Sequence, residues 1–401
     1  MSHTSPGRRG TTTATLAVVA LVVAVAVGGL WWLRQDDGPT AVFEDRKSGV
    51  SQPRQDGSRP DDEEGGRGDG SDGNRSGGEG SEGDGTDGSE ADAALGERAE
   101  DIAAQDFPDD PRVVVISVDG LGSPWVSQES TPTLATLLAQ GAGTLNARTA
   151  VEKTVTLPNH TGMVTGRRVD AASGGHGVTW NHTSSGSVAP GTESVFTVID
   201  EADGTSAVFA GKAKFEMWGR AWPGAIDELV IKKRQPALVT AAIRELRNDD
   251  HHDLVLLHLA GPDSAGHDSG WGSPSYVDAV TRADADVERV VSAILGDDDL
   301  AEDVVLVVTA DHGGLPGTAG HSDTSRPVNY TIPFVVWGPG IQAGDLYTLN
   351  PDYEDPGTGQ PAYDEPPPVR NGDVANLVTD LLGLGPVPGS EFDAGHELDV
   401  E

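Results

Sequence analysis

Acidic and histidine side chains recur directly after three short apolar runs that lie far apart in the chain. Six of them are candidate metal ligands: Asp119, Asp263, His267, Asp311, His312 and His321. Carboxylates and neutral imidazoles are the ligands that zinc takes where thiolates are absent, and this chain has no cysteine. An aspartate after one strand is commonly a cap or turn residue, but three such occurrences indicate a metal site. Crowded carboxylates would also need cations between them.

A candidate nucleophile, Thr156, lies between the first and second of these runs. Pro158 and the apolar residues after it predict a helix that begins at or just after Thr156. A hydroxyl group there would lie at the positive end of the helix dipole, beside free backbone N–H groups, which suits an alkoxide and phosphate oxygens. On this segment alone, a plain capping role for Thr156 is an equal alternative. The neighbouring metal cluster favours catalysis.

The elements that must position these side chains are predicted to be parallel strands that alternate with helices. Residues 112–118, 254–259 and 304–309 are short β-branched runs, as in buried parallel strands. Residues 131–141 and 273–296 combine a cap residue, an early proline and a closing glycine, which predicts helices. The alternation predicts an α/β fold, a three-layer sandwich around a mostly parallel sheet. Because ligands bind beyond the carboxyl ends of such strands, the six candidate ligands should meet there.

The charge of the chain limits its partners. The formal net charge is −37 and the sequence pI is about 4.4. Such a field repels nucleic acid and anionic membrane surfaces and attracts divalent cations, so no nucleic-acid binding is expected. The alternative is that the acidity serves solubility.

The N-terminal region predicts export and a membrane anchor. Residues 1–13, with Arg8 and Arg9, would form a cytoplasmic tail, and the apolar residues 14–33 a transmembrane helix that ends in two tryptophans. The catalytic part would then be extracytoplasmic. The competing interpretation is a cleaved signal peptide, because residues 24–26 resemble a processing site.

The following segment is predicted to separate the anchor from the catalytic domain. Residues 34–108 are rich in Gly, Ser, Asp and Glu, a composition that buries too little apolar surface to form a core. We therefore expect a disordered acidic linker there, with the catalytic metallohydrolase domain at residues 109–401.

Several motifs together resemble a known family. They are, in order, Asp119-Gly120, Thr156-Leu157-Pro158-Asn159-His160, Val164-Thr165-Gly166, His176-Gly177-Val178-Thr179-Trp180-Asn181, Asp263-Ser264-Ala265-Gly266-His267, Asp311-His312-Gly313 and Gly320-His321. This set resembles the type I phosphodiesterase/nucleotide pyrophosphatase branch of the alkaline phosphatase superfamily and spans roughly residues 113–337. The resemblance implies an alkaline phosphatase-like fold and an enzyme that cleaves phosphodiester or pyrophosphate bonds of a small phosphodiester or nucleotide substrate.

The resemblance also implies residue roles. It implies two divalent ions, zinc in this family, with Asp263, His267 and His321 on one and Asp119, Asp311, His312 and the Thr156 oxygen on the other. The Thr156 hydroxyl would attack phosphorus and form a phospho-threonine, while Asn181 and the backbone N–H of Leu157 would bind phosphoryl oxygens. Leu157 stands where base-stacking members often have an aromatic residue, which weakens any prediction of nucleotide preference.

Two alternative functions remain at this point. A phosphomonoesterase would use the same metals, but such enzymes typically have a serine nucleophile and an arginine clamp, and no motif here fixes an arginine. An inactive anchored surface protein is the other alternative, and the complete ligand set argues against it. Lys212 and Lys214 lie between the motifs; solvated lysines are the default interpretation, and contact with the charge of a substrate is the alternative.

Overall fold

The computed structural model describes residues 98, 101–102, 104–392 and 398–401. The predicted tail and anchor, and the predicted linker up to residue 97, lie outside the described residues. Within the described part of the chain, none of the helices combines the length and the apolar character needed to cross a bilayer.

The described elements alternate between strands and helices. The strands are β1 (Arg112–Val118), β2 (Ala142–Arg148), β3 (Ser206–Ala210), β4 (Glu228–Ile231), β5 (Leu254–Leu259), β6 (Val304–Thr309), β7 (Thr331–Trp337) and β8 (Gly344–Asp345). The α-helices are α3 (Pro132–Gln140), α4 (Thr156–Thr165), α5 (Val195–Glu201), α6 (Glu216–Ala221), α7 (Gln235–Leu246), α8 (Gly261–Ser269), α9 (Pro274–Leu295), α10 (Asp298–Asp303), α11 (Pro327–Tyr330), α12 (Leu346–Leu349) and α13 (Val374–Leu381). Four 3₁₀ helices are η1 (Ser123–Trp125), η2 (Ala171–Ser173), η3 (Ala213–Phe215) and η4 (Asn371–Asp373).

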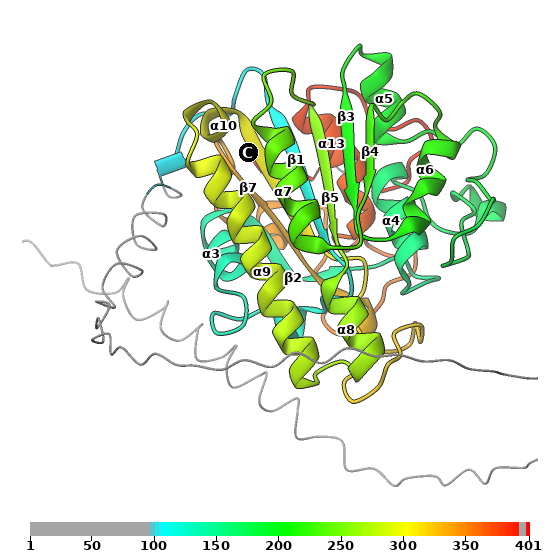
Figure 1. Ribbon diagram of the computed structural model, residues 1–401. Helices are drawn as coiled ribbons and strands as arrows, with labels where there is room; N and C mark the ends of the chain where they lie inside the picture. Colours follow the sequence, from blue (N-terminus) through cyan, green and yellow to red (C-terminus); the bar gives the residue numbers. More distant parts are fainter. Residues whose placement is uncertain (1–97, 99–100, 103, 393–397) are drawn as a thin grey trace, which may run out of the picture. The chain divides into compact units, whose positions relative to one another are not determined.

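One eight-stranded sheet, in the order β4-β3-β5-β1-β6-β7-β2-β8, forms the centre of the fold (Figure 1). Its pairings are parallel except that β7 runs antiparallel to both β6 and β2. The prediction of a mostly parallel sheet is therefore confirmed, with a mixed edge beyond β6. The three strands predicted at 112–118, 254–259 and 304–309 are β1, β5 and β6, with the same bounds.

Strand β1 lies between β5 and β6, and the register of these pairs decides where the functional loops begin. Val118 pairs with Leu259, and Ser117 pairs with Thr309. Every residue of the three strands is buried, as the continuous β-branched runs predict for strands covered on both faces. The three strands therefore end at nearly the same level, and the residues after them emerge side by side.

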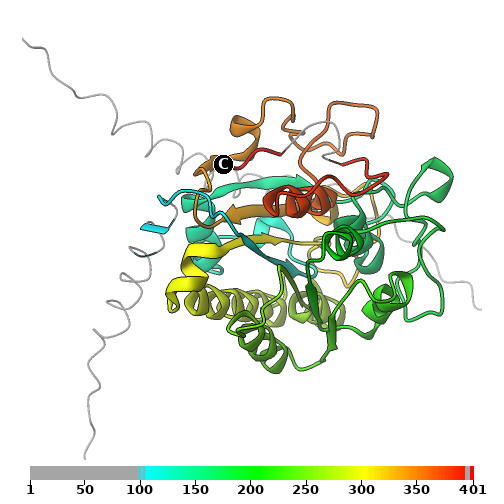
Figure 2. The same ribbon diagram turned by 90° about the horizontal axis from the view of Figure 1, so that it is seen from above.

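Helices cover both faces of the sheet. Figure 2 shows α13, in red, on one side of the sheet and α9, in yellow-green, on the other. Helix α4 packs against α13, whereas α3 and α7 pack against α9. The predicted helices at 131–141 and 273–296 are α3 and α9, which are followed by Gly141 and Gly296. This arrangement is the predicted three-layer sandwich.

The core of the domain reaches further toward the N-terminus than the predicted linker boundary. Ile102 is 2% exposed and belongs to the main hydrophobic cluster. The Gln105 carbonyl oxygen accepts a hydrogen bond from the backbone N–H of Gly340. The polar composition of the segment predicts a linker here, yet one buried isoleucine and a backbone hydrogen bond attach it to the folded body.

Candidate metal centre and nucleophile

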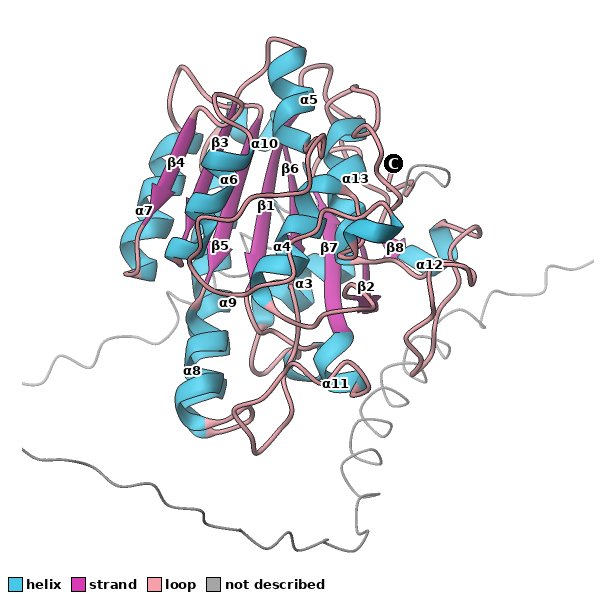
Figure 3. Ribbon diagram, turned by 90° about the vertical axis from the view of Figure 1, so that its right-hand side faces the viewer, coloured by secondary structure: helices cyan, strands magenta, loops and turns pink. Residues whose placement is uncertain are grey.

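The candidate ligands meet beyond the carboxyl ends of β1, β5 and β6. Figure 3 shows β1 and β5 running toward the end of the sheet where α8 and α11 lie. Asp119 directly follows β1, and Asp311 and His312 follow β6. Asp263 and His267 are on α8, four residues apart, so they share one face of that helix.

The side chains form two overlapping groups that could hold metal ions. One group is Asp263, His312 and His321, and the other is Asp119, Asp311 and His312; within each group the ligand atoms lie within 4.8 Å of one another. His312 belongs to both, with Nε2 at 3.2 Å from Asp311 Oδ2 and 3.8 Å from Asp263 Oδ1. The two buried groups are therefore adjacent, as in a two-metal site.

His267 lies at the solvent side of this cluster. Its Nε2 atom is 3.4 Å from Asp263 Oδ1 and 3.1 Å from His321 Nε2, and its side chain is 48% exposed. All six predicted ligands are thus gathered in one place. Because His312 is shared between the groups, the geometry does not by itself assign each ligand to one ion.

Three buried ligand atoms have no hydrogen-bond partner in the described part of the chain: Asp263 Oδ1, Asp311 Oδ2 and His312 Nε2. A buried polar atom without a partner is destabilising by about 1–3 kcal/mol. Here three such atoms converge, and all are donor atoms that divalent metals bind. The residues therefore fit a pair of divalent cations.

Backbone carbonyl groups fix the tautomers of two of the histidines. Nδ1 of His312 is 2.8 Å from the Gly313 carbonyl oxygen, and Nδ1 of His321 is 2.6 Å from that of Thr154. A carbonyl oxygen only accepts, so each Nδ1 carries the proton. The Nε2 lone pairs then point into the cluster, which is the arrangement that metal-binding histidines need.

Burial and neighbouring charges also prepare the groups for cations. Burial alone would raise the pKa of Asp119, but the Lys212 ammonium group and a hydrogen bond from His258 hold this pKa well below its usual range. Burial, together with the charges of Asp119 and Asp263, raises the pKa of Asp311 well above its usual value. Burial lowers the pKa values of His312 and His321, which keeps both imidazoles neutral. Carboxylates that repel one another and neutral imidazoles suit bound cations.

Thr156 begins helix α4, as predicted, and its side chain faces the cluster. Thr156 is 1% exposed, and its Oγ1 lies 3.5 Å from Asp119 Oδ1. The chain before it is extended at Val155, and the left-handed Gly166 (φ 62°) ends the helix. His160, one turn later, donates from Nδ1 to the Thr156 carbonyl oxygen at 2.9 Å. The start of α4 therefore holds the threonine hydroxyl beside the carboxylate.

The residues predicted to bind substrate lie beside Thr156 but bind each other in this structure. The backbone N–H of Leu157 donates to Asn181 Oδ1 at 2.9 Å. The Leu157 side chain is fully buried, so it offers a substrate no surface, and its contribution is limited to the backbone N–H. A phosphoryl oxygen would reach that N–H once the Asn181 amide group turns aside.

The expectation that Lys212 and Lys214 are solvated is wrong. Lys212 Nζ lies 2.5 Å from both Asp119 Oδ2 and Asp263 Oδ2, and Lys214 Nζ lies 2.8 Å from Asn181 Oδ1. Both lysines come from the short turn into η3, after β3. Their i, i+2 spacing at the end of a buried strand was the available signal, but by itself it does not say which way the side chains point.

Comparisons with known proteins agree with this geometry. The family model described as type I phosphodiesterase/nucleotide pyrophosphatase matches residues 113–198 and 175–365. Among curated proteins, GPI ethanolamine phosphate transferase 1 of the yeast Yarrowia lipolytica is 32% identical over 148 residues, which are 35% of this chain and 15% of that protein. The match to this relative therefore spans a small part of its length.

Solved structures show the same fold at low sequence identity. Murine ectonucleotide pyrophosphatase/phosphodiesterase 5, as an inactive variant in complex with AMP, superposes with a TM-score of 0.52 at 14% identity, over 70% of this chain and 96% of that one. A lipoteichoic acid synthase from Listeria monocytogenes gives a TM-score of 0.52 at 17% identity, over 76% and 81% of the two chains.

Proposed function

This chain belongs to the type I phosphodiesterase/nucleotide pyrophosphatase family of the alkaline phosphatase superfamily, and we propose that it hydrolyses phosphodiester or pyrophosphate bonds with two divalent metal ions, most simply zinc. The observation that carries the proposal is the convergence of three buried, unpartnered ligand atoms, from Asp263, Asp311 and His312, near the Thr156 hydroxyl group. A buried cluster of this kind beside a hydroxyl group at a helix start suits phosphoryl transfer.

Different residues of the chain would bind the metal ions and attack the phosphorus atom. Bound divalent cations would supply Lewis acidity and lower the pKa of an oxygen ligand. Asp119, Asp311, His312, Asp263, His267 and His321 would hold them. Thr156 Oγ1 would form a bond to phosphorus, its proton passing to solvent, while the bond from phosphorus to the leaving oxygen breaks. Water would then cleave the phospho-threonine and restore the hydroxyl group.

The backbone around Thr156 would stabilise the charge that develops on the phosphoryl oxygens. The N–H of Leu157 and the side chain of Asn181 lie together at the start of α4. Fixed donors of this kind typically contribute 10²–10³ in rate when they face the developing charge. In the resting arrangement the Leu157 N–H donates to Asn181 Oδ1, so the Asn181 amide group would have to turn before both donors face a phosphoryl oxygen.

The test compares turnover of bis-p-nitrophenyl phosphate by the full chain in detergent, with added zinc and with a chelator. We expect turnover that needs metal and that falls by at least about a thousandfold in Thr156→Ala, because no other hydroxyl group replaces the nucleophile. Thr156→Ser is the matched control and should retain turnover. Undiminished turnover in Thr156→Ala, with folding and metal content unchanged, would remove Thr156 from the reaction.

A phosphotransferase is a second candidate, favoured by the match to an ethanolamine phosphate transferase. In that case an alcohol in place of water would accept the phosphoryl group from Thr156. The two candidates differ in their product. Incubation with substrate and an alcohol acceptor such as ethanolamine or glycerol should give free phosphate or monoester for a hydrolase, and a new phosphodiester for a transferase, separable by phosphorus NMR.

We also propose that residues 14–33 anchor the protein in a membrane, with the catalytic domain outside the cytoplasm. The proposal rests on the apolar composition of this segment and on Arg8 and Arg9 before it. Protease added to intact cells should then degrade the catalytic domain and leave a short membrane-bound fragment. Release of the whole domain into the medium would support the cleaved signal peptide, and protection from protease would contradict export.

A further inference from the structure

The two lysines of the segment Lys212-Ala213-Lys214 bring cationic groups to both sides of the reaction centre. Lys212 lies between one carboxylate of each metal-binding group, Asp119 and Asp263. Lys214 binds Asn181 Oδ1, the same atom that accepts the backbone N–H of Leu157. Strand β3 and the 3₁₀ helix η3, whose last residue Phe215 is buried, fix the direction of this segment.

Lys214 lies beside the point where a phosphoryl oxygen of the substrate would bind. Leu157 N–H, Asn181 and Lys214 surround one point at the N-terminus of α4, beside Thr156. In the resting structure the Asn181 oxygen occupies that point and accepts from both donors. An oxygen of a substrate that replaces it would accept from an ammonium group as well as from the backbone, so it would be bound more strongly when it carries a full negative charge.

The charges of the site also call for more than a singly charged substrate. With divalent ions bound, Asp119, Asp263 and Asp311 would supply three negative charges, whereas the two ions and the two ammonium groups would bring six positive ones. Ionised Thr156 would remove one of the three positive charges in excess. A diester, which carries one negative charge, would leave the buried site positive, and a substrate with two charges would neutralise it.

We propose, as a refinement of the function proposed above, that Lys214 selects substrates with at least two negative charges at or beside the scissile phosphorus. Lys212 supports this role, since ions bound by Asp119 and Asp263 would take over its two carboxylate partners and release its ammonium group. The selected chemistry is a pyrophosphate bond, and a terminal phosphoryl group is the alternative that the test below separates from it. Lys214 would thus bind the additional negative charge of the substrate, a role for which the sequence offers no arginine motif.

Lys214→Met tests this with three substrates and the full chain. The substrates are p-nitrophenyl phosphate, which has two charges on the scissile phosphoryl group, diadenosine diphosphate, which has the second charge on the neighbouring one, and bis-p-nitrophenyl phosphate, which has a single charge. We expect kcat/KM to fall about tenfold to a hundredfold for the substrates with two charges and less than about threefold for the diester. The larger fall in kcat/KM, for p-nitrophenyl phosphate or for diadenosine diphosphate, shows whether the second charge binds on the scissile phosphoryl group or on the neighbouring one.

A binding measurement checks the same claim without turnover. In a zinc-loaded Thr156→Ala background, Lys214→Met should weaken inorganic phosphate about tenfold or more and leave dimethyl phosphate nearly unchanged by calorimetry. Lys214→Arg should keep the preference because it keeps the charge. Lys233→Met, at an exposed lysine of the same region, is the matched control and should leave all constants as they are.

Equal losses for all three substrates in Lys214→Met, or unchanged phosphate binding, would overturn the role of Lys214. Neither result would contradict the proposed function, because the test of that function is the loss of turnover in Thr156→Ala. Conversely, turnover that survives Thr156→Ala would refute the proposed nucleophile, while the phosphate-binding ratio would still report on Lys214.

Discussion

His258 lies outside the candidate ligand set but orients one of its members, Asp119. Its Nδ1 accepts the backbone N–H of Gly211 at 3.2 Å, so the ring proton is on Nε2, which donates to Asp119 Oδ2 at 2.8 Å. The ring is fully buried, and burial lowers its pKa, so it stays a neutral donor. One oxygen of Asp119 is thereby fixed, and the other, Oδ1, faces His312 Nε2 at 3.6 Å.

From this contact we predict that His258→Ala weakens metal binding by about tenfold to a hundredfold, as is usual when a group that orients a ligand is removed. Titration of zinc into the metal-free full chain, followed by calorimetry, measures the effect. His252→Ala is the matched control, because His252 binds Glu245 away from the cluster. Equal affinity in wild type and His258→Ala would mean that Asp119 is held without this ring.

At the residue scale, the convergence of the candidate ligands could be predicted from sequence, and the inward orientation of the lysines could not. Asp263 and His267 were recognisable because residue type, spacing and position after a strand all agree. Lys212 is 51 residues from one carboxylate that it binds and 93 from the other. Nothing local distinguishes a lysine that turns inward from a solvated one, since the difference arises only when β3 and β1 are placed in the same sheet.

At the scale of elements, helix α8 could not be predicted from the sequence. Its first residues are Gly261 and Pro262, and Gly266 lies in its middle, a composition that favours a loop. It forms because it packs along α9 and because Gly266 lets the Trp271 ring approach: an added Cβ would lie 2.6 Å from that ring. Tertiary packing therefore overrides helix propensity here, and it places Asp263 and His267 on one face.

The turn after β1 is equally constrained. Gly120 has φ +78°, and an added Cβ would lie 2.8 Å from the Cα atom of Asp263. Its carbonyl oxygen accepts hydrogen bonds from Trp271 Nε1 and Tyr276 Oη at 3.1 and 2.8 Å. Its N–H donates to Asp311 Oδ1 at 3.0 Å. One glycine thus connects the ends of β1 and β6 with α8.

We predict that Gly120→Ala lowers the free energy of unfolding by about 3 kcal/mol or more, since it combines left-handed strain of about 1–2 kcal/mol with a backbone clash that costs a further 1–3 kcal/mol. Gly224→Ala separates the two effects: Gly224 has φ +92° but open space around it, so only the strain should appear. Urea unfolding of both variants gives the comparison. A loss no larger than in Gly224→Ala would show that α8 yields to the added methyl group.

At the scale of the whole molecule, the direction of β7 could not be predicted from the sequence. Residues 331–337 are a buried apolar run like β1, yet β7 runs antiparallel to its neighbours. A continuous apolar run indicates burial on both faces but carries no information on direction. Direction follows from the connections, which become known only with the three-dimensional arrangement.

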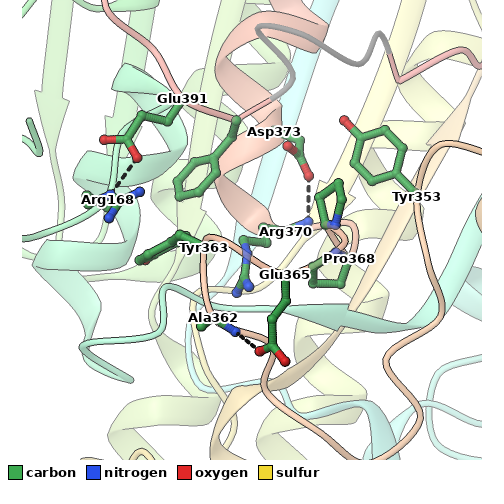
Figure 4. A pocket seen from close by; sticks show the side chains of 11 residues that line it. Arg168, Tyr353, Ala362, Tyr363, Glu365, Pro368, Arg370, Asp373 and Glu391 are labelled. Carbon is green, nitrogen blue, oxygen red and sulfur yellow. Dashed lines mark hydrogen bonds and ion pairs between the residues drawn. The ribbon is translucent and has the colours of Figure 1, made fainter. Parts of the chain in front are cut away.

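A cavity of about 240 Å³ is lined by Arg168 and residues between Tyr353 and Phe392, and none of the candidate metal ligands lines it (Figure 4). Within it the Tyr363 ring lies near two guanidinium groups, with the Cζ atoms of Arg168 and Arg370 at 4.2 and 5.1 Å from its centroid. Asp373, the last residue of η4, is buried in this region and accepts the backbone N–H of Arg370. Burial raises the pKa of Asp373 to about 7.

This buried carboxyl group should make the stability of the whole domain depend on pH. Its pKa is higher in the folded protein than the usual 3.8, so the folded state favours the protonated form. The stability that it contributes is present at acid pH and is lost as the pH rises through about 7. Asp373→Asn keeps an oxygen that can accept the Arg370 N–H but cannot ionise. We therefore predict that the free energy of unfolding of the wild type falls relative to Asp373→Asn, by about 4 kcal/mol between pH 4 and pH 8.

Urea unfolding of the chelator-treated full chain at both pH values measures this difference, because the metal-binding groups are the same in the two proteins and cancel. Asp352→Asn, at an exposed aspartate, is the matched control and should follow the wild type at both pH values. If Asp373→Asn also followed the wild type, the carboxyl group would be ionised in the folded state at neutral pH. The Arg370 guanidinium group, whose charge favours the ionised form, would then outweigh burial.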